Sequence, residues 1–217
     1  MEKVEVLRQY FGFSSFREGQ QTLIDAVLAG RDVLGVMPTG GGKSLCYELP
    51  ALLLPGLTLV ISPLISLMKD QVMALQNAGI PAGCIHSAMS VEELREAYRD
   101  TRFGAYKILY IAPERLLTDG FCALAQELEI SLLAVDEAHC ISQWGQDFRP
   151  SYLKILDFLQ KLPRRPALAA FTATATAQVR SDIVRILQLQ DPVTVVTGFD
   201  RPNLRFEVLR PQDKRRA

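Results

Sequence analysis

A glycine-rich segment, residues 37–44, ends in a lysine and a serine. Consecutive glycines let backbone N–H groups approach phosphate oxygens with no side chain in the way. An apolar run precedes the segment and a helical pattern follows it, so the positive end of a helix dipole would face the same phosphates. Lys43 could then reach the β- and γ-phosphates and act in catalysis, while the Ser44 hydroxyl could hold Mg²⁺. We expect a magnesium–ATP site with contacts from Thr39, Gly40, Gly41, Gly42, Lys43 and Ser44.

The general phosphate-loop pattern has a glycine where this chain has Met37. The alternative is therefore a flexible glycine-rich turn with an incidental lysine. The strand-like run before the segment, the helical pattern after it and the Lys-Ser ending together favour the phosphate loop.

Two carboxylates, Asp136 and Glu137, directly follow an apolar run at 131–135. In a parallel sheet such a strand end lies at the carboxyl edge, where these folds bind ligands. We expect Asp136 to support the magnesium ion, and Glu137 to position and deprotonate the attacking water. Two acids at a strand end are common on protein surfaces, but a phosphate loop upstream in the same sheet favours the catalytic interpretation. His139 is as well explained by a hydrogen-bonded loop position as by a coupling role.

Short apolar runs recur along the chain, with helical patterns between them. Their apolar residues are nearly continuous instead of alternating, as expected of strands buried on both faces. This order predicts an α/β fold in which a parallel sheet is flanked by helices on both faces. The strands are expected at 32–36, 57–61, 83–85, 107–111, 131–135, 167–171 and 193–196.

Apolar residues at helical spacing predict the helices between these strands. One helix covers 23–28 and stops at Gly30, and another begins at Pro63 and ends at Gly79. Two later helices are expected to bury one apolar stripe each. These stripes consist of Leu153, Leu156, Leu159 and Leu162, and of Val179, Ile183 and Ile186.

Composition limits the class of protein. The 217 residues carry 24 Lys and Arg against 24 Asp and Glu, so a nucleic-acid partner would have to bind a local patch. Four separated cysteines form no close ligand pair, which predicts free thiols and no zinc in this chain. We expect no signal peptide and no membrane association, and a cytoplasmic location, at the nucleoid if the protein is bacterial.

With these motifs in place, the chain resembles the first motor domain of a RecQ-family DNA helicase of superfamily 2, with a RecA-like P-loop fold. In this family methionine is usual at the start of the phosphate loop, which accounts for Met37. Residues 11–20 resemble the family's adenine-reading motif. The resemblance implies that Gln20 hydrogen-bonds the base edge and that Arg17 and the Phe13 ring stack on the base, although tyrosine is common in place of Phe13.

Three further segments resemble motifs that contact DNA or couple it to hydrolysis. Residues 62–71 and 110–116 are similar to strand-contacting motifs, in which Ser62 would bind the backbone. Residues 171–175 resemble the motif that links hydrolysis to domain movement, which assigns this role to Thr172 and Thr174.

Residues 140–150 are similar to the aromatic-rich loop of RecQ helicases, which senses single-stranded DNA. Trp144 and Phe148 could stack on bases, and Arg149 could pair with a phosphate. Bacterial members usually carry histidine where this chain has Gln146. The alternative for Trp144 is a hydrophobic contact that pins the loop.

The resemblance implies one RecA-like domain over residues 1–208, followed by a linker at 209–217 to a second motor domain. The intact protein would be an ATP-driven helicase that moves 3′ to 5′ on single-stranded DNA and unwinds duplex DNA in repair and recombination. We expect the isolated chain to bind nucleotide weakly and not to unwind DNA. The alternatives are a nucleotide- and nucleic-acid-binding module without appreciable turnover, and a DEAH-type RNA remodeller.

Overall fold

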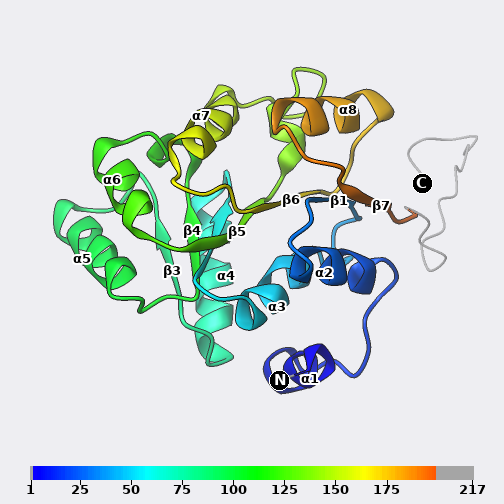
Figure 1. Ribbon diagram of the computed structural model, residues 1–217, viewed down its shortest axis with the longest axis horizontal. Helices are drawn as coiled ribbons and strands as arrows, with labels where there is room; N and C mark the ends of the chain where they lie inside the picture. The colour runs from blue at the N-terminus through cyan, green and yellow to red at the C-terminus, as the bar shows by residue number, and fades with distance from the viewer. Residues whose placement is uncertain (1, 199–217) are drawn as a thin grey trace, which may run out of the picture.

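A single parallel sheet forms the centre of the protein, which a computed structural model describes over residues 2–198 (Figure 1). Within these residues seven strands occur in the order β3-β4-β2-β5-β6-β1-β7, and every neighbouring pair is parallel. The strands are β1 (Val33–Val36), β2 (Leu57–Ile61), β3 (Ala82–Ile85), β4 (Ile108–Ile111), β5 (Ile130–Val135), β6 (Ala167–Thr172) and β7 (Val193–Val196).

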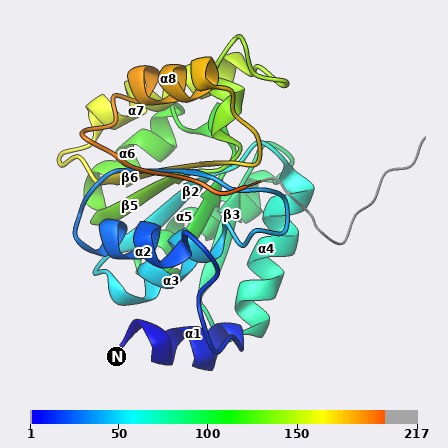
Figure 2. The same ribbon diagram turned by 90° about the vertical axis from the view of Figure 1, so that its right-hand side faces the viewer.

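Helices connect the strands and cover both faces of the sheet (Figure 2). On one face lie α1 (Lys3–Phe11), α2 (Gln20–Leu28), α3 (Leu45–Leu53) and α4 (Ile65–Asn77). On the other lie α5 (Val91–Arg102), α6 (Asp119–Glu127), α7 (Lys154–Lys161) and α8 (Ala177–Ile186). Three short 3₁₀ helices occur among the described residues. They are η1 (Pro113–Arg115) after β4, η2 (Ala138–Ile141) after β5 and η3 (Pro150–Leu153) before α7.

The central strands contribute to two separate hydrophobic clusters because successive side chains point to opposite faces. Leu59 and Ile61 of β2 pack with α5–α8, whereas Val60 between them packs with α1–α4. Both faces are therefore buried, which explains why the apolar runs in the sequence do not alternate. The predicted α/β fold with helices on both faces is confirmed.

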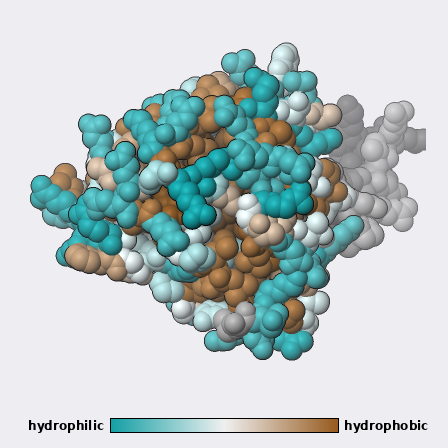
Figure 3. Space-filling model, in the orientation of Figure 1, coloured by the Kyte–Doolittle hydropathy of each residue, from teal (hydrophilic) through white to brown (hydrophobic). Residues whose placement is uncertain are grey.

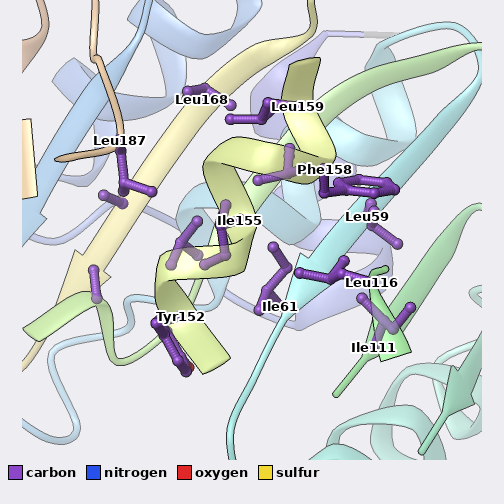
Figure 4. Packing of buried hydrophobic residues seen from close by; sticks show 14 of the residues in the cluster. Leu59, Ile61, Ile111, Leu116, Tyr152, Ile155, Phe158, Leu159, Leu168 and Leu187 are labelled. Atoms are coloured by element: carbon purple, nitrogen blue, oxygen red, sulfur yellow. The ribbon is translucent and has the colours of Figure 1, made fainter. Parts of the chain in front are cut away.

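Three details differ from the sequence prediction. The stripe assigned to α7 is wrong, because Leu153 is 42% exposed while Ile155 and Phe158 are fully buried (Figure 4). The 3₁₀ turn η3 ends at Leu153, so the helical phase begins one residue later than the leucine spacing suggests. Pro63 lies before α4, which begins only at Ile65.

The strand β7 is the third difference, because it lies at the edge of the sheet and is half-exposed along its length. Val193 and Val195 pack against the cluster under α1–α4, whereas Thr194 and Val196 on the opposite face are exposed, so only one face of β7 is covered by helices.

The remaining expectations concern surface and termini. Figure 3 shows a mostly hydrophilic face with apolar residues gathered over α3, whose last leucines are partly buried. All four cysteines are free, and two of them are buried. Among residues 2–198, none of the helices combines the length and the apolarity needed to cross a membrane. The expected linker at 209–217 lies outside the described residues.

Candidate active site

The glycine-rich segment forms a loop between β1 and α3, at the carboxyl edge of the sheet. Met37 N–H donates to the Thr172 carbonyl over 3.0 Å, which fixes the start of the loop against β6. Gly40 and Gly42 adopt φ of 78° and 81°, a region that disfavours other residues. A Cβ at Gly42 would lie 2.2 Å from Gln20 Nε2, so a side chain there would displace the Gln20 amide or the loop.

Lys43 and Ser44 occupy the turn that leads into α3. The Lys43 ammonium lies 3.2 Å from the Met37 carbonyl and folds back across the loop. From there its charge partly offsets the upward shift that burial imposes on the pKa of Asp136, and it adds a small part to the lowered pKa of Glu137. Both carboxylates thus lie within electrostatic reach of the loop lysine.

The residues expected to read adenine also contact the phosphate loop. Gln20 is buried, and its Nε2 donates to the Gly42 carbonyl over 3.0 Å. Its Oε1 accepts from the Arg17 N–H over 2.8 Å, and the Arg17 guanidinium donates to the Gly40 carbonyl. Phe13 is 49% exposed. Gln20 thus supports the loop directly, a contact that the sequence alone did not reveal.

The acidic pair follows β5 through a sharp turn. Asp136 N–H donates to the Ile61 carbonyl over 2.9 Å, and the Asp136 carbonyl accepts from the Tyr152 hydroxyl over 2.9 Å. Glu137 adopts φ of 47°, a left-handed conformation that is costly for a residue other than glycine. This turn lets two consecutive carboxylates leave the strand in different directions.

A short chain of contacts joins the acidic pair to residues 171–175, at the end of β6 and just after it. Glu137 Oε2 lies 3.2 Å from His139 Nδ1, which lies 2.8 Å from the Thr172 hydroxyl. The Thr172 hydroxyl also donates to the Thr174 carbonyl over 3.1 Å. His139 therefore makes the hydrogen bonds expected of a loop histidine, and the same contacts leave a coupling role open.

The environment separates the two carboxylates electrostatically. Burial, with the neighbouring charge of Glu137, raises the pKa of Asp136 to about 6. The hydrogen bond from His139 lowers the pKa of Glu137. Contacts with Cys140 and with Glu137 in turn raise the pKa of His139. Glu137 is therefore a carboxylate at neutral pH and can accept a hydrogen bond from water.

Ser44 and Asp136 offer two hard oxygen ligands at the site expected for magnesium. Mg²⁺ in nucleotide sites usually takes one or two protein oxygens and completes its shell with phosphates and water. The described residues contain no group of three or more His, Cys, Asp and Glu side chains that could hold a metal without such help. The donor set therefore fits Mg²⁺ that arrives with a nucleotide.

A buried polar layer beneath the loop was not expected from the sequence. Glu48 of α3 is 6% exposed and accepts from the Tyr110 hydroxyl over 3.1 Å. Burial raises the pKa of Glu48 to about 7, and the charge of Asp136 adds to the effect. In the sequence Glu48 is one polar residue in an apolar helix, and only the spacing of four from Ser44 hints that it lies under the loop.

Three neighbouring strand ends carry buried polar atoms without a hydrogen-bond partner among the described residues. These atoms are Ser62 Oγ after β2, His86 Nδ1 after β3 and Arg115 Nε after β4. Backbone hydrogen bonds from Ser62 to Ile111 and from Ala112 to Ile85 hold the three ends side by side. Ser62 and Arg115 lie in the two segments predicted to contact DNA, and only Ser62 was singled out there. His86 could have been found by its position directly after a strand.

The aromatic loop extends from η2 to η3 and presents Trp144 at its tip. Trp144 is 75% exposed, and Phe148 is half-buried. Gly145 allows a tight turn, because a Cβ there would lie 2.3 Å from the His139 carbonyl. Arg149 pairs with Asp147 over 2.8 Å and donates to the Pro63 carbonyl over 3.1 Å. The loop therefore connects the acidic pair to the segment after β2.

Comparisons with known proteins agree with this arrangement. The sequence model of the DEAD/DEAH box helicase family matches residues 17–183. The ATP-dependent DNA helicase RecQ of Bacillus subtilis is 50% identical over 212 residues, which cover 97% of this chain and 36% of that protein. RecQ of Pasteurella multocida is 48% identical over 95% of this chain and 32% of its own length. The chain thus spans about a third of the length of these curated relatives.

Solved structures support the fold. A hypothetical ATP-dependent RNA helicase from Sulfolobus tokodaii superposes with a TM-score of 0.68 at 22% identity, over 89% of this chain and 56% of that one. The DUF1998 helicase MrfA bound to DNA gives a TM-score of 0.70 at 16% identity, over 90% of this chain and 29% of that one. At these identities the likeness concerns the fold alone.

Proposed function

The chain belongs to the DEAD/DEAH box helicase family, and from this premise we propose that it is the ATP-binding motor domain of a RecQ-like DNA helicase. The observation that carries the proposal is the continuous path from the phosphate loop to the aromatic loop. Lys43 lies near Asp136 and Glu137, Glu137 contacts His139, and the chain continues from η2 directly into the aromatic loop. A nucleotide bound at one end would thus be linked to a nucleic-acid strand at the other.

In the proposed reaction a water molecule attacks the γ-phosphorus of ATP, and the bond to the β–γ bridging oxygen breaks to give ADP and phosphate. Glu137 orients this water and accepts its proton, and Lys43 stabilises charge on the β- and γ-phosphates. Mg²⁺ held by Ser44 and Asp136 would neutralise phosphate charge. Backbone N–H groups of Gly40, Gly41 and Gly42, with Thr39, would bind the phosphates. The Gly41 N–H donates to the Pro38 carbonyl over 2.8 Å and would first have to leave it.

Adenine binding would involve Phe13, Arg17 and Gln20. Gln20 has both amide ends engaged, one with the Arg17 backbone and the other with Gly42. Reading a base would require one of these hydrogen bonds to be exchanged for one to the adenine edge. Base recognition would then be coupled to the conformation of the phosphate loop.

A nucleic-acid backbone would lie across the ends of β2, β4 and β3. The polar atoms without partners at Ser62, His86 and Arg115 would form hydrogen bonds to phosphate oxygens, which removes the cost of leaving buried donors unsatisfied. Trp144 and Phe148 would stack on bases, and Arg149 would pair with phosphate after release from Asp147. Thr172 and Thr174 would transmit the state of the nucleotide through His139.

The proposed partners are single-stranded and duplex DNA and a second RecA-like domain of the same protein. Movement 3′ to 5′ along DNA in repair and recombination would need closure of two such domains on ATP. This chain spans about a third of the RecQ relatives, and arginine fingers supply about 10³–10⁵ in rate when a second domain or protein provides them. We therefore expect the isolated chain to hydrolyse ATP slowly and not to unwind DNA.

Steady-state hydrolysis of magnesium–ATP, with and without single-stranded DNA, tests the proposal. Stimulation by DNA that Lys43→Ala abolishes would support it, whereas equal stimulation by RNA would favour an RNA remodeller. Efficient strand separation by this chain alone would contradict the expectation that one domain does not suffice.

A further inference from the structure

The outer part of the aromatic loop has little packing beneath it. A cavity of about 320 Å³ lies between the loop and α8, with Trp144, Phe148 and Leu153 on one side and Asp182 and Arg185 on the other. Within the loop, residues 143–150 are mostly exposed. Apolar packing beneath the tip of the loop is therefore incomplete, and hydrogen bonds contribute to fixing its position.

Ser142 and Asp182 provide such a contact between the loop and α8. The Ser142 hydroxyl donates to Asp182 Oδ2 over 2.7 Å and accepts from the Trp144 backbone N–H over 3.2 Å. Ser142 is fully buried and Asp182 is 6% exposed, so water competes little with these hydrogen bonds. One hydroxyl thus connects a carboxylate of α8 to the backbone of the exposed tryptophan.

Neighbours on α8 hold the Asp182 carboxylate in this orientation. Arg185 Nη2 donates to Asp182 Oδ1 over 3.0 Å, and Gln178 Nε2 approaches the same oxygen at 3.5 Å. The hydrogen bond from Ser142, with the contact from Arg185, lowers the pKa of Asp182. The carboxylate is therefore charged at neutral pH, and hydrogen bonds to a charged acceptor are stronger than neutral ones.

The helix that carries Asp182, α8, follows directly after residues 171–175, the segment proposed to couple hydrolysis to domain movement. It begins after Thr176, whose hydroxyl caps it by accepting from the Val179 N–H over 3.3 Å. Ile183 belongs to the same buried cluster as Ile141 of η2. A displacement of the segment at Thr172 and Thr174 would thus move α8, and with it the carboxylate that holds the loop.

We propose that Asp182 is a positioning residue that holds the backbone of Trp144 through Ser142 and so links the DNA-sensing loop to the segment after β6. The inference rests on the proposed role of this loop in sensing DNA. Asp182 touches neither nucleotide nor DNA in this account. It acts by fixing where the indole is presented, and by moving the indole when α8 moves.

Trp144 is the single tryptophan of the chain, so its fluorescence anisotropy reports the order of this loop directly. We expect Asp182→Ala to lower the steady-state anisotropy of Trp144, because the loop gains motion on the nanosecond timescale. Half-saturation by an oligothymidine strand should shift upward by about tenfold, within the usual range of coupling between sites. Ser181→Ala, an exposed change on the same helix, is the matched control and should alter neither value.

Two further variants separate positioning from simple damage to the fold. Asp182→Asn keeps an oxygen that can accept from Ser142, so it should restore most of the anisotropy. Ser142→Ala combined with Asp182→Ala should give the effect of one substitution, because both remove the same contact. Binding of a fluorescent ATP analogue monitors the fold, and if Asp182→Ala has lost it, Ser142→Ala, which leaves α8 intact, carries the test.

The possible results distinguish this inference from the proposed function. Wild-type anisotropy in both Asp182→Ala and Ser142→Ala would overturn the inference, whatever the response to DNA. A second result is possible: Asp182→Ala lowers the anisotropy, but DNA never changes the fluorescence of Trp144 in the wild type. The contact through Ser142 would then stand, while the proposed sensing of DNA by the loop, and the link from Asp182 to that sensing, would be overturned.

Discussion

The phosphate loop and the aromatic loop leave the same edge of the sheet, yet they are held in opposite ways. The phosphate loop is enclosed by Gln20, Arg17 and β6, and a single Cβ at Gly42 would collide with a neighbour. The aromatic loop presents a largely exposed indole above a cavity, and a few hydrogen bonds through Ser142 and Arg149 fasten it.

This contrast follows from what each loop is proposed to bind. A phosphate group has a fixed shape and charge, so a preformed cradle lowers the cost of ordering the site on binding. A single strand of DNA is variable, and a loop that reports its presence must change position when it binds. Rigid packing would therefore favour phosphate binding but would prevent a loop from changing position when DNA binds.

The largest effect is expected from Gly42→Ala. The new Cβ would face Gln20 Nε2 at 2.2 Å in a backbone with φ of 81°, so the Gln20 amide must leave its contact or the loop must shift, and nucleotide affinity should fall by at least about tenfold. Gly40→Ala is the matched control, since Gly40 has φ of 78° but open space around it. Titration with a fluorescent ATP analogue compares the two, and equal losses would mean that the contact with Gln20 does not shape the loop.

Trp144→Ala should weaken DNA binding by the aromatic loop and leave the phosphate loop unaffected. Loss of stacking on one base typically weakens single-strand binding by about 1–3 kcal/mol, and nucleotide affinity should stay unchanged. Phe103→Ala is the control, because Phe103 is 80% exposed but lies at the end of α5. Anisotropy of a labelled oligothymidine measures the difference. Equal DNA affinity in wild type and Trp144→Ala would show that the exposed indole does not contact the strand.

Gln20→Ala should have a smaller effect, of a few-fold, on the nucleotide site. The change removes both the proposed base contact and the hydrogen bond to Gly42, so affinity for ATP and GTP should fall together while the preference for ATP narrows. Competition binding with the two nucleotides provides the measurement. An unchanged ratio with lower affinity for both would assign Gln20 to loop support alone.

Glu48→Gln should have the smallest effect on binding but a clear effect on stability. Because the folded protein raises the pKa of Glu48 from 4.5 to about 7, the folded state holds a proton that the unfolded state releases in this range. Stability should therefore fall as pH rises through this window, by up to about 3 kcal/mol, and Glu48→Gln should remove that loss. Denaturant unfolding at pH 8 and pH 5 tests this, with the exposed Glu129→Gln as control. If Glu48→Gln increased the free energy of unfolding equally at pH 5 and pH 8, the titration of Glu48 would not be the cause of the stability change.

Sequence reasoning predicted those parts of the molecule that follow from local chemistry. The phosphate loop, the acidic pair and the strands of the sheet are each specified by a few adjacent residues, such as Lys43 and Ser44. The stripe of α7 was misassigned because the 3₁₀ turn at Pro150–Leu153 shifts the helical phase, and leucine spacing does not reveal that shift.

Contacts between distant segments could not be predicted in the same way. Gln20 and Gly42 are 22 residues apart, and Ser142 and Asp182 are 40 apart, so only the folded chain brings them together. Glu48 and His86 were missed because burial, and not residue type, makes them unusual. The sequence thus predicts the strands and the loops that follow them better than it predicts which distant residues hold those loops in place.

The most direct test of the central claim is a titration of this chain with a fluorescent ATP analogue in the presence of Mg²⁺, with Lys43→Ala measured in parallel. The account predicts saturable, magnesium-dependent binding by the wild type that weakens by at least about tenfold in Lys43→Ala, because the charge facing the β- and γ-phosphates is lost. Equal affinity of the two proteins would show that residues 37–44 are not the nucleotide site.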